Sequence, residues 1–169
     1  IKAGIGYVSE DRLTLGLVQQ QSVADNAVLT ILDKLRGRFR LIDDYRKNRI
    51  VAEWIAKLGV RVADPDQAVS TLSGGNQQKI VLAKWVLTQP RILILDSPTV
   101  GVDVGAKASI YQLIHLLAQE GIAILLISDE VPEVYYNCDR VLHFSGGSVI
   151  GEYLPGQVSQ QQLAEAVNA

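Results

Sequence analysis

The sequence predicts an α/β fold, in which a mostly parallel sheet is flanked by helices and a helical segment is inserted. Two runs, RILILD at 91–96 and IAILLIS at 122–128, consist largely of Ile and Leu. Such continuous apolar runs are typical of parallel strands that are covered on both faces. A pattern with helical spacing precedes each run, at 76–87 and at 106–120, and this alternation indicates an α/β architecture.

Three shorter strands are predicted outside this alternating part. AGIGYV, residues 3–8, is expected to be a short buried strand. RVLHF at 140–144 and SVIGEY at 148–153 flank Gly146 and Gly147. Two strand-like runs that flank paired glycines predict a β-hairpin.

The region between the first strand and the alternating part is predicted to be helical. Ser22 is a suitable N-cap for the segment VADNAVLTILDKL that follows it. Ile50, Trp54 and Leu58 recur at a spacing of four residues, which gives the next helix one apolar face. Gly59 then stands where a glycine commonly ends a helix.

Composition indicates one globular domain and excludes several classes. The chain has 169 residues, of which 48% are hydrophobic, enough for a sizeable core. Its 16 basic and 18 acidic residues give a formal net charge of −2, so no general attraction to nucleic acid is expected. The densest basic stretch is interpreted as a solvated loop or helix end, because acidic residues lie near it. These residues are Lys34, Arg36, Arg38 and Arg40, with Asp33, Asp43 and Asp44 as neighbours.

The sequence also bears on the cellular compartment. The single cysteine, Cys138, has no partner for an internal disulfide, which fits a reducing cytoplasm. The longest apolar run, GIAILLI, is far shorter than the roughly 18 residues that a membrane span needs. We recognise no signal peptide, and the sequence starts at Ile1 without Met, so we interpret the chain as a fragment.

The most informative motif is LSGGNQQK, residues 72–79. Two glycines after Ser73, directly before a helical pattern, let backbone N–H groups approach an anion closely. Partial positive charge at the helix N-terminus adds to this attraction. An ordinary cap and turn is the alternative interpretation. The phosphate-binding interpretation gains weight from Asp96, which ends an apolar strand 23 residues after Ser73.

Together these motifs resemble those of ATP-binding-cassette (ABC) ATPases. LSGGNQQK is similar to their signature motif, ILILD to their Walker B strand and GVD, residues 101–103, to their D-loop. LSGGNQQKIVLAKWVL and PTVGVDVGAKASIYQLI resemble the ATPase subunits of bacterial carbohydrate importers of the ribose, galactose and xylose type, which fuse two cassettes in one polypeptide. YVSEDRLTLGL resembles the segment after the first core strand in the second, C-terminal cassette of those subunits. The resemblance extends from about Gly4 to Glu152.

The resemblance implies a P-loop NTPase-like cassette with part of its N-terminal region missing. The nucleotide-binding loop GxxxxGK[ST] does not occur in this sequence, so we expect the chain alone to bind ATP weakly. Residues 1–21 then correspond to a core strand and Q-loop-like segment, and 22–71 to the helical subdomain. Residues 72–154 contain the signature, Walker B, D-loop and switch region, and 155–169 form a tail helix.

Four positions correspond to the catalytic residues of the family. The resemblance implies that Asp96 and Glu10 bind Mg²⁺. Glu10 stands where cassettes usually carry the Q-loop glutamine. Ser97 stands in place of the usual Walker B glutamate, and a serine hydroxyl does not accept the proton of the attacking water at neutral pH. Asp129 occupies the position of the switch histidine, or is simply an exposed loop acid. The resemblance therefore implies a degenerate hydrolytic site.

The signature residues are expected to contact ATP bound by another cassette. In the family each nucleotide lies between the Walker motifs of one cassette and the signature of its partner. Asp103 is placed at the cassette–cassette interface, with a simple turn residue as the alternative. The expected nucleotide-contacting residues are Leu72, Ser73, Gly74, Gly75, Asn76, Gln77 and Asp103.

The resemblance further implies ATP and Mg²⁺ as cofactors and several partners. These are a second cassette, as a fused N-terminal half or in a homodimer, the membrane permease and, indirectly, a periplasmic sugar-binding protein. No nucleic acid is expected, and the chain is placed peripherally at the cytoplasmic face of the inner membrane. Its helical subdomain would contact the permease.

Other classes of function remain as alternatives. A non-catalytic nucleotide-binding or regulatory ABC module outside sugar transport is the main one. A DNA-repair or chromosome-maintenance ATPase would need a long coiled coil, for which there is no room between Ser22 and Thr71. A ribosome-associated cassette would be more basic and carry glutamate after Walker B. His115 and His143 lack partners at metal-ligand or triad spacing and are interpreted as structural, and Lys79 as a residue of the signature helix.

Overall fold

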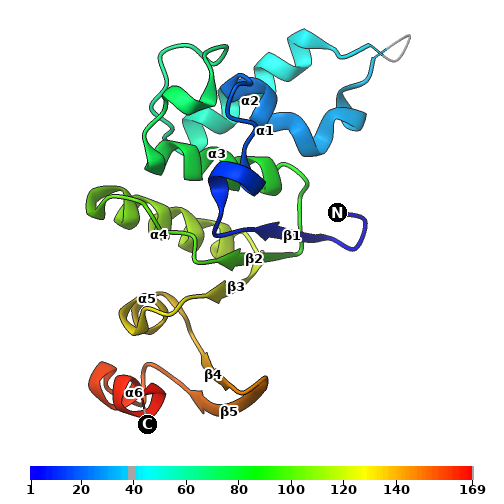
Figure 1. Ribbon diagram of the computed structural model, residues 1–169. Helices are drawn as coiled ribbons and strands as arrows, with labels where there is room; N and C mark the ends of the chain where they lie inside the picture. Colours follow the sequence, from blue (N-terminus) through cyan, green and yellow to red (C-terminus); the bar gives the residue numbers. More distant parts are fainter. Residues whose placement is uncertain (38–40, 169) are drawn as a thin grey trace. The chain divides into compact units, whose positions relative to one another are not determined.

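The structure is a computed structural model that describes residues 1–37 and 41–168. The chain forms two compact units, Ile1–Leu125 and the part that begins at Leu126. Figure 1 shows the order of their helices and strands. Arg38 and Arg40 of the predicted basic loop lie outside the described residues.

A three-stranded sheet in the order β1-β2-β3 carries the motifs. Its strands are β1 (Ile5–Val8), β2 (Ile92–Asp96) and β3 (Ala123–Ile127). Strands β1 and β2 are parallel, with Val8 opposite Leu95 in the register. The α/β architecture and the predicted strands are confirmed. Because β1 and β2 are parallel, their carboxyl ends meet at one edge of the sheet.

The expectation that β2 and β3 are covered on both faces is wrong for the described residues. Along β2, Leu93 and Leu95 are buried while Ile92 is 40% exposed, and in β3 Leu125 and Ile127 are 49% and 45% exposed. The first strand, β1, is also buried on one face only. Helix α3 (Gly74–Val86) packs on β1 from one side only. An apolar run indicates a parallel strand but does not say which segment covers each of its faces.

The helical segment lies on the far side of α3 from the sheet (Figure 1). It contains α1 (Val23–Val28), a 3₁₀ turn at Leu29–Leu35 and α2 (Asp44–Lys57). The side chain of Ser22 accepts a hydrogen bond from the amide of Asp25 at 3.0 Å, which confirms the predicted N-cap. Gly59 follows α2 with φ +57°, as predicted for a helix end.

The predicted helix over residues 23–35 tightens into a 3₁₀ helix at Leu29. Thr30 and Ile31 are β-branched and lower the helical propensity at this point. The hydroxyl of Thr30 also donates to the backbone carbonyl of Lys84 on α3. Packing against α3 therefore decides the local winding.

The second unit contains α5 (Val131–Asn137), β4 (Val141–Ser145), β5 (Ser148–Tyr153) and α6 (Gln160–Val167). Strands β4 and β5 are antiparallel, and Gly146 and Gly147 have φ angles of +58° and +79°. This confirms the predicted hairpin. Among the described residues, none of the helices combines the length and apolar character that crossing a bilayer requires.

Candidate functional site

The segments that follow β1 and β2 border an open hollow of about 440 Å³. Ligands of open parallel sheets bind beyond the carboxyl ends of the strands. The lining residues are Ser9, Glu10, Asp11, Arg12 and Leu13 after β1, and Asp96, Val100 and Gly101 at the end of β2. The structure therefore places two predicted site residues, Glu10 and Asp96, at one hollow.

Asp96 is held by a residue that the motif analysis missed. The hydroxyl of Tyr7 donates a hydrogen bond to Oδ2 of Asp96 at 2.7 Å. This hydrogen bond to a carboxylate raises the pKa of Tyr7, since losing the phenol proton would place two negative charges together. Tyr7 pairs with Ile94 in the parallel register, and Ile94 and Asp96 share a face of their strand. The period of two could therefore have indicated this contact.

Ser97 adopts an unusual backbone conformation. Its φ angle is +45°, in the left-handed region that residues other than glycine rarely occupy. Its carbonyl accepts a hydrogen bond from the amide of Val100 at 3.2 Å, so the chain turns sharply directly after Asp96. Strain of this kind is concentrated at functional sites.

The segment after Glu10 is fixed by the side chain of Asp11. Oδ1 of Asp11 accepts hydrogen bonds from the amides of Leu13 at 3.2 Å and Thr14 at 3.0 Å. The hydroxyl of Thr14 also donates to this carboxylate, and these bonds lower the pKa of Asp11. The short helical turn Arg12–Gly16 that follows β1 is thereby capped at its start.

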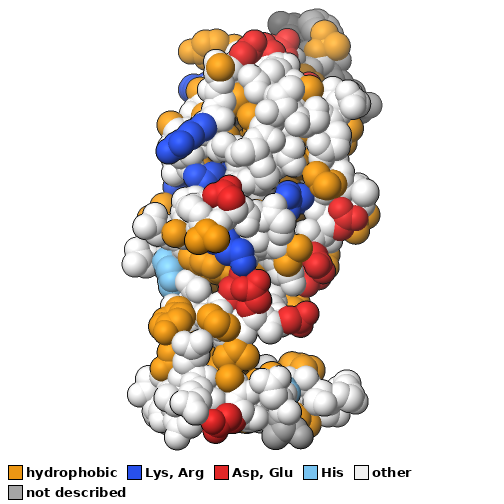
Figure 2. All heavy atoms as spheres, turned by 60° about the vertical axis from the view of Figure 1, so that its left-hand side comes forward, with side chains coloured by type: hydrophobic (Ala, Val, Ile, Leu, Met, Phe, Trp, Pro, Cys, Tyr) orange, Lys and Arg blue, Asp and Glu red, His pale blue; other side chains and the backbone are white. Residues whose placement is uncertain are grey.

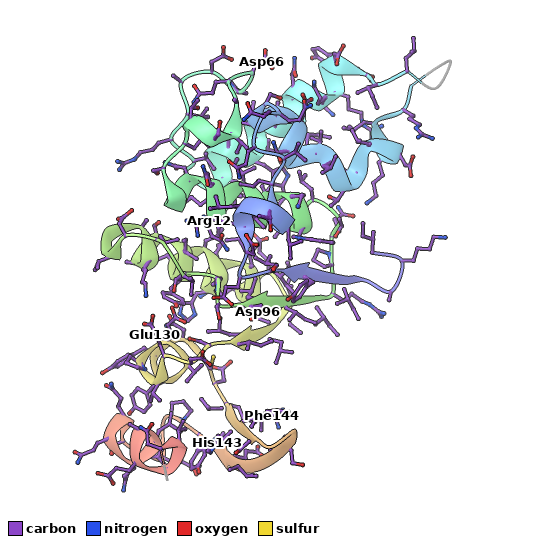
Figure 3. The ribbon with its side chains drawn as sticks, viewed as in Figure 1. Arg12, Asp66, Asp96, Glu130, His143 and Phe144 are labelled. Atoms are coloured by element: carbon purple, nitrogen blue, oxygen red, sulfur yellow. The ribbon has the colours of Figure 1, made fainter. Side chains whose placement is uncertain are left out.

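Arg12 connects this turn to the segment after β2. Its Nη1 donates to the carbonyl of Val100 at 2.6 Å and its Nη2 to the carbonyl of Gly101 at 2.8 Å. Figure 3 shows Arg12 at the start of the turn after β1 and Asp96 at the end of β2. Sequence reasoning passed over Arg12, since no local pattern relates it to a residue 88 positions away.

The predicted signature motif forms the N-terminus of α3. Ser73 is the N-cap residue and is exposed, but its side chain does not cap the helix amides. Instead its Oγ accepts a hydrogen bond from Nδ2 of Asn76 at 2.9 Å, while Oδ1 of Asn76 accepts from the amide of Arg61 at 2.9 Å. The first amides of a helix have no intrahelical acceptor, so the exposed turn suits an anion.

The other predicted signature residues support this turn from inside. Leu72 is buried, and Nε2 of the buried Gln77 donates to the carbonyls of Val69 at 3.3 Å and Leu72 at 3.2 Å. Gly75 is packed against α4 (Val104–Gln119), where a Cβ would lie 2.5 Å from Cβ of Ala106. The second glycine is therefore required by helix packing as well as by any approach of an anion.

Asp103 acts as a helix cap. Its Oδ1 accepts a hydrogen bond from the amide of Ala106 at 2.9 Å, at the start of α4. This hydrogen bond supports the alternative interpretation of Asp103 as a local structural residue. Asp103 remains exposed, so the cap leaves room for a partner.

The remaining candidate residues lie elsewhere. Asp129 belongs to the second unit, where it is exposed and precedes α5. Lys79 lies on α3, as predicted, and its Nζ donates to the carbonyl of Gly59 at 3.0 Å. Burial, followed by the charge of Arg61, lowers the pKa of Lys79. Lys79 therefore closes the end of α2 and does not face the hollow.

The oxygen atoms around the hollow fit a magnesium ion that is completed by a ligand. Asp96 and Glu10 supply carboxylates and Ser9 a hydroxyl group at its lining. Among the described residues, no group of three or more His, Cys, Asp or Glu is placed to hold a metal. Mg²⁺ usually keeps one or two carboxylates and takes its other ligands from phosphates and water, so this donor set fits it.

Comparison with known proteins identifies the family. The model of the ABC transporter family matches residues 1–100. The chain belongs to the ABC transporter family. The motifs LSGGNQQK and ILILD predicted this family, and the prediction is confirmed. The chain has the α/β fold of an ABC cassette.

The curated relatives of this ABC chain include xylose import ATP-binding proteins named XylG. It is 43% identical to the protein of Yersinia pseudotuberculosis, 46% to that of Burkholderia cenocepacia and 44% to that of Escherichia coli, each over 166 residues. These alignments cover 98% of this chain but 32% of each relative. The chain thus spans about a third of their length.

Solved ABC cassettes have the same fold. The dimeric ATP-binding cassette MJ0796 in a post-hydrolysis state, bound to ADP and Pi, superposes with a TM-score of 0.73 at 21% identity, over 89% of this chain and 62% of that chain. CbiO1 from Clostridium perfringens, part of the transporter complex cbiONQ, gives 0.74 at 23% identity, over 99% and 64%. At this identity the likeness concerns the fold.

Proposed function

We propose that this chain is the C-terminal cassette of a two-cassette ATPase subunit that powers sugar import. The observation that carries the proposal is the arrangement of two sites on one chain. Glu10 and Asp96 share a hollow at the sheet edge, while the exposed Ser73 begins α3 without capping it. The first arrangement suits a nucleotide held by this cassette, and the second suits a nucleotide held by another.

The cassette's own site is proposed to hydrolyse ATP slowly. The hydroxyl of Ser97 cannot act as a general base at neutral pH, and a general base typically contributes about 10²–10⁴-fold. Glu10 and Asp129 place carboxylates at two further positions where the family has neutral or positive groups. Negative charge beside phosphate is electrostatically unfavourable.

The signature is proposed to complete the site of the partner cassette. The amides at Ser73, Gly74 and Gly75 would contact the triphosphate that the partner holds, with Leu72, Asn76 and Gln77 supporting the turn and Asp103 at the interface. Helix N-termini attract anions through unpaired amides and the helix dipole. Such a cassette contributes to transport without rapid hydrolysis of its own.

ATP and Mg²⁺ are the proposed cofactors. Asp96 and Glu10 would hold the ion, directly or through water, and the bound ion would neutralise phosphate charge. Tyr7 would orient the carboxylate of Asp96 through its 2.7 Å hydrogen bond.

A groove in the helical segment is the proposed permease contact. It has a volume of about 320 Å³. Its lining residues are Ile31, Lys34, Leu35, Arg46, Ile50, Trp54, Leu87 and Gln89. An apolar floor with basic residues at its rim suits a short amphipathic helix. The cassette would then lie at the cytoplasmic face of the inner membrane and act indirectly with a periplasmic sugar-binding protein.

Nucleic acid remains an unfavoured partner in this proposal. On the face drawn in Figure 2, Lys and Arg side chains do not form a continuous patch and acidic side chains lie among them. The formal net charge of −2 gives no general attraction either.

The proposal is tested in the two-cassette polypeptide. We expect Asp96→Asn to lower ATP turnover by less than about twofold, because the partner site supplies most of it. Ser73→Arg should lower turnover by about tenfold or more, since a long side chain would obstruct the partner's nucleotide at the helix N-terminus. Ser70→Arg is the matched control, because Ser70 is also exposed and lies three residues earlier.

Two results would contradict the proposal. A large loss of turnover with Asp96→Asn would show that the cassette's own site is a principal catalyst. Equal turnover of Ser73→Arg and Ser70→Arg would show that the signature completes no site, and would favour a non-catalytic or regulatory module.

A further inference from the structure

Arg12 touches three motif-bearing segments at one point. It starts the turn after Glu10, donates to the segment after β2 and lies against the first residue of α3. We propose that Arg12 is the positioning residue that holds the signature turn in its anion-binding arrangement. This inference rests on the function proposed above and deepens it.

The first part of the argument is the pair of hydrogen bonds to the backbone. One guanidinium donates to two successive carbonyls, of Val100 at 2.6 Å and Gly101 at 2.8 Å. Such charge-assisted bonds are about twice as strong as neutral ones. The planar guanidinium presents two N–H groups to the two carbonyls in a fixed geometry. The ammonium group of a lysine is a single point of charge and would not fix both carbonyls in this way.

The second part is the lack of space around the guanidinium. A Cβ on Gly74 would lie 3.0 Å from Nη2 of Arg12 and 3.1 Å from the carbonyl oxygen of Gly101. A Cβ on Gly101 would lie 3.2 Å from the same Nη2. The start of α3, the guanidinium and the turn after β2 are therefore in direct contact, and a displacement of one must displace the others.

The third part is electrostatic. A cation beside a helix N-terminus is unfavourable, because that end carries partial positive charge. In addition, Nε of Arg12 is buried and has no hydrogen-bond partner among the described residues, which costs free energy. The first cost is offset if an anion binds at the amides of α3, since the positive charge of the guanidinium and the helix end then attract it together.

The test uses the two-cassette polypeptide with Arg12→Ala and Arg12→Lys. The probes are a non-hydrolysable ATP analogue and ADP, each with Mg²⁺, titrated by calorimetry. We expect Arg12→Ala to weaken binding of the triphosphate analogue about tenfold, which corresponds to the loss of a charge-assisted hydrogen bond. ADP binding should change less than about twofold, because the signature amides are proposed to contact the terminal phosphate.

Arg36→Ala is the matched control. Arg36 pairs with Asp33 at 3.1 Å, and both side chains are largely exposed, so its removal should leave both affinities unchanged. Arg12→Lys keeps the charge but not the paired geometry, and should weaken analogue binding by about threefold. If Arg12→Ala does not fold, the ratio of analogue to ADP affinity in Arg12→Lys decides the question.

The two proposals fail in different ways. Unchanged analogue-to-ADP ratios in both Arg12 variants, while Ser73→Arg still weakens the analogue, would overturn the role of Arg12 alone. A parallel loss of analogue and ADP binding together with a lower unfolding temperature would assign Arg12 to general stability and also overturn it. No effect of Ser73→Arg on the analogue would overturn the proposed function itself.

Discussion

At the scale of single residues, the chemistry of the site is decided directly after β2. Asp96 presents a carboxylate that Tyr7 orients at 2.7 Å. The next residue, Ser97, has φ +45° and lies half-buried at the start of a sharp turn. The backbone at Ser97 is therefore strained, as is common at functional sites. The Ser97 side chain has no group that can act as a general base at neutral pH.

Ser97→Glu tests how far one residue accounts for the slow hydrolysis proposed for this cassette. In the two-cassette polypeptide with the partner site disabled, we expect this change to raise hydrolysis by less than about tenfold, well below the 10²–10⁴-fold of a working general base. In the proposed function, Glu10 and Asp129 would still be carboxylates at two positions where the family has neutral or positive groups. The rate is measured under single-turnover conditions. Recovery of full turnover from this substitution would show that Ser97 was the sole defect.

At the scale of elements, contacts between helices decide where glycine is required. Gly75 and Gly105 are each the second residue of a helix, α3 and α4. A Cβ on Gly75 would collide with Ala106, whereas at Gly105 the nearest atom is Oδ1 of Asp103, at 3.4 Å. The signature glycine therefore has a packing role within this chain that is separate from any ligand.

Gly75→Ala is expected to lower the free energy of unfolding. Overpacking against Ala106 should cost about 1–3 kcal/mol. Gly105→Ala is the matched control and should stabilise the chain by about 0.5–1 kcal/mol, since alanine has the higher helix propensity. Urea denaturation followed by circular dichroism measures both. Equal stability of the two variants would mean that α3 and α4 separate easily at this contact.

At the scale of the whole molecule, the chain belongs to the ABC transporter family but covers only part of the length of its relatives. It spans about a third of its curated relatives, and its sequence contains no GxxxxGK[ST] loop. The segmentation into residues 1–21, 22–71, 72–154 and 155–169 stays a prediction.

The chain by itself is therefore expected to bind ATP weakly. Without the loop whose amides and lysine hold the phosphates, the dissociation constant for MgATP should lie above about 1 mM. Calorimetric titration of the 169-residue chain measures it. A sub-millimolar value would mean that the hollow beside Asp96 holds nucleotide without that loop.

Local pattern determined most of the elements. The N-cap at Ser22, the helix end at Gly59 and the hairpin turn at Gly146 and Gly147 follow from residues close in sequence, and all three were predicted correctly. The continuous apolar run likewise predicted β2, and helical spacing predicted the helix that begins at the signature. These features depend on backbone preferences and on the period of burial, which neighbouring residues encode.

Only the tertiary structure decided which distant residues meet. The hydrogen bonds of Arg12 to the carbonyls of Val100 and Gly101, and the contact of Gly75 with Ala106, join segments that local patterns treat separately. The incomplete burial of β1 is also a property of the tertiary structure. An apolar run indicates that burial of the strand is favourable, but it does not say which segment covers each face. Such contacts depend on how whole elements pack, which no short window of sequence contains.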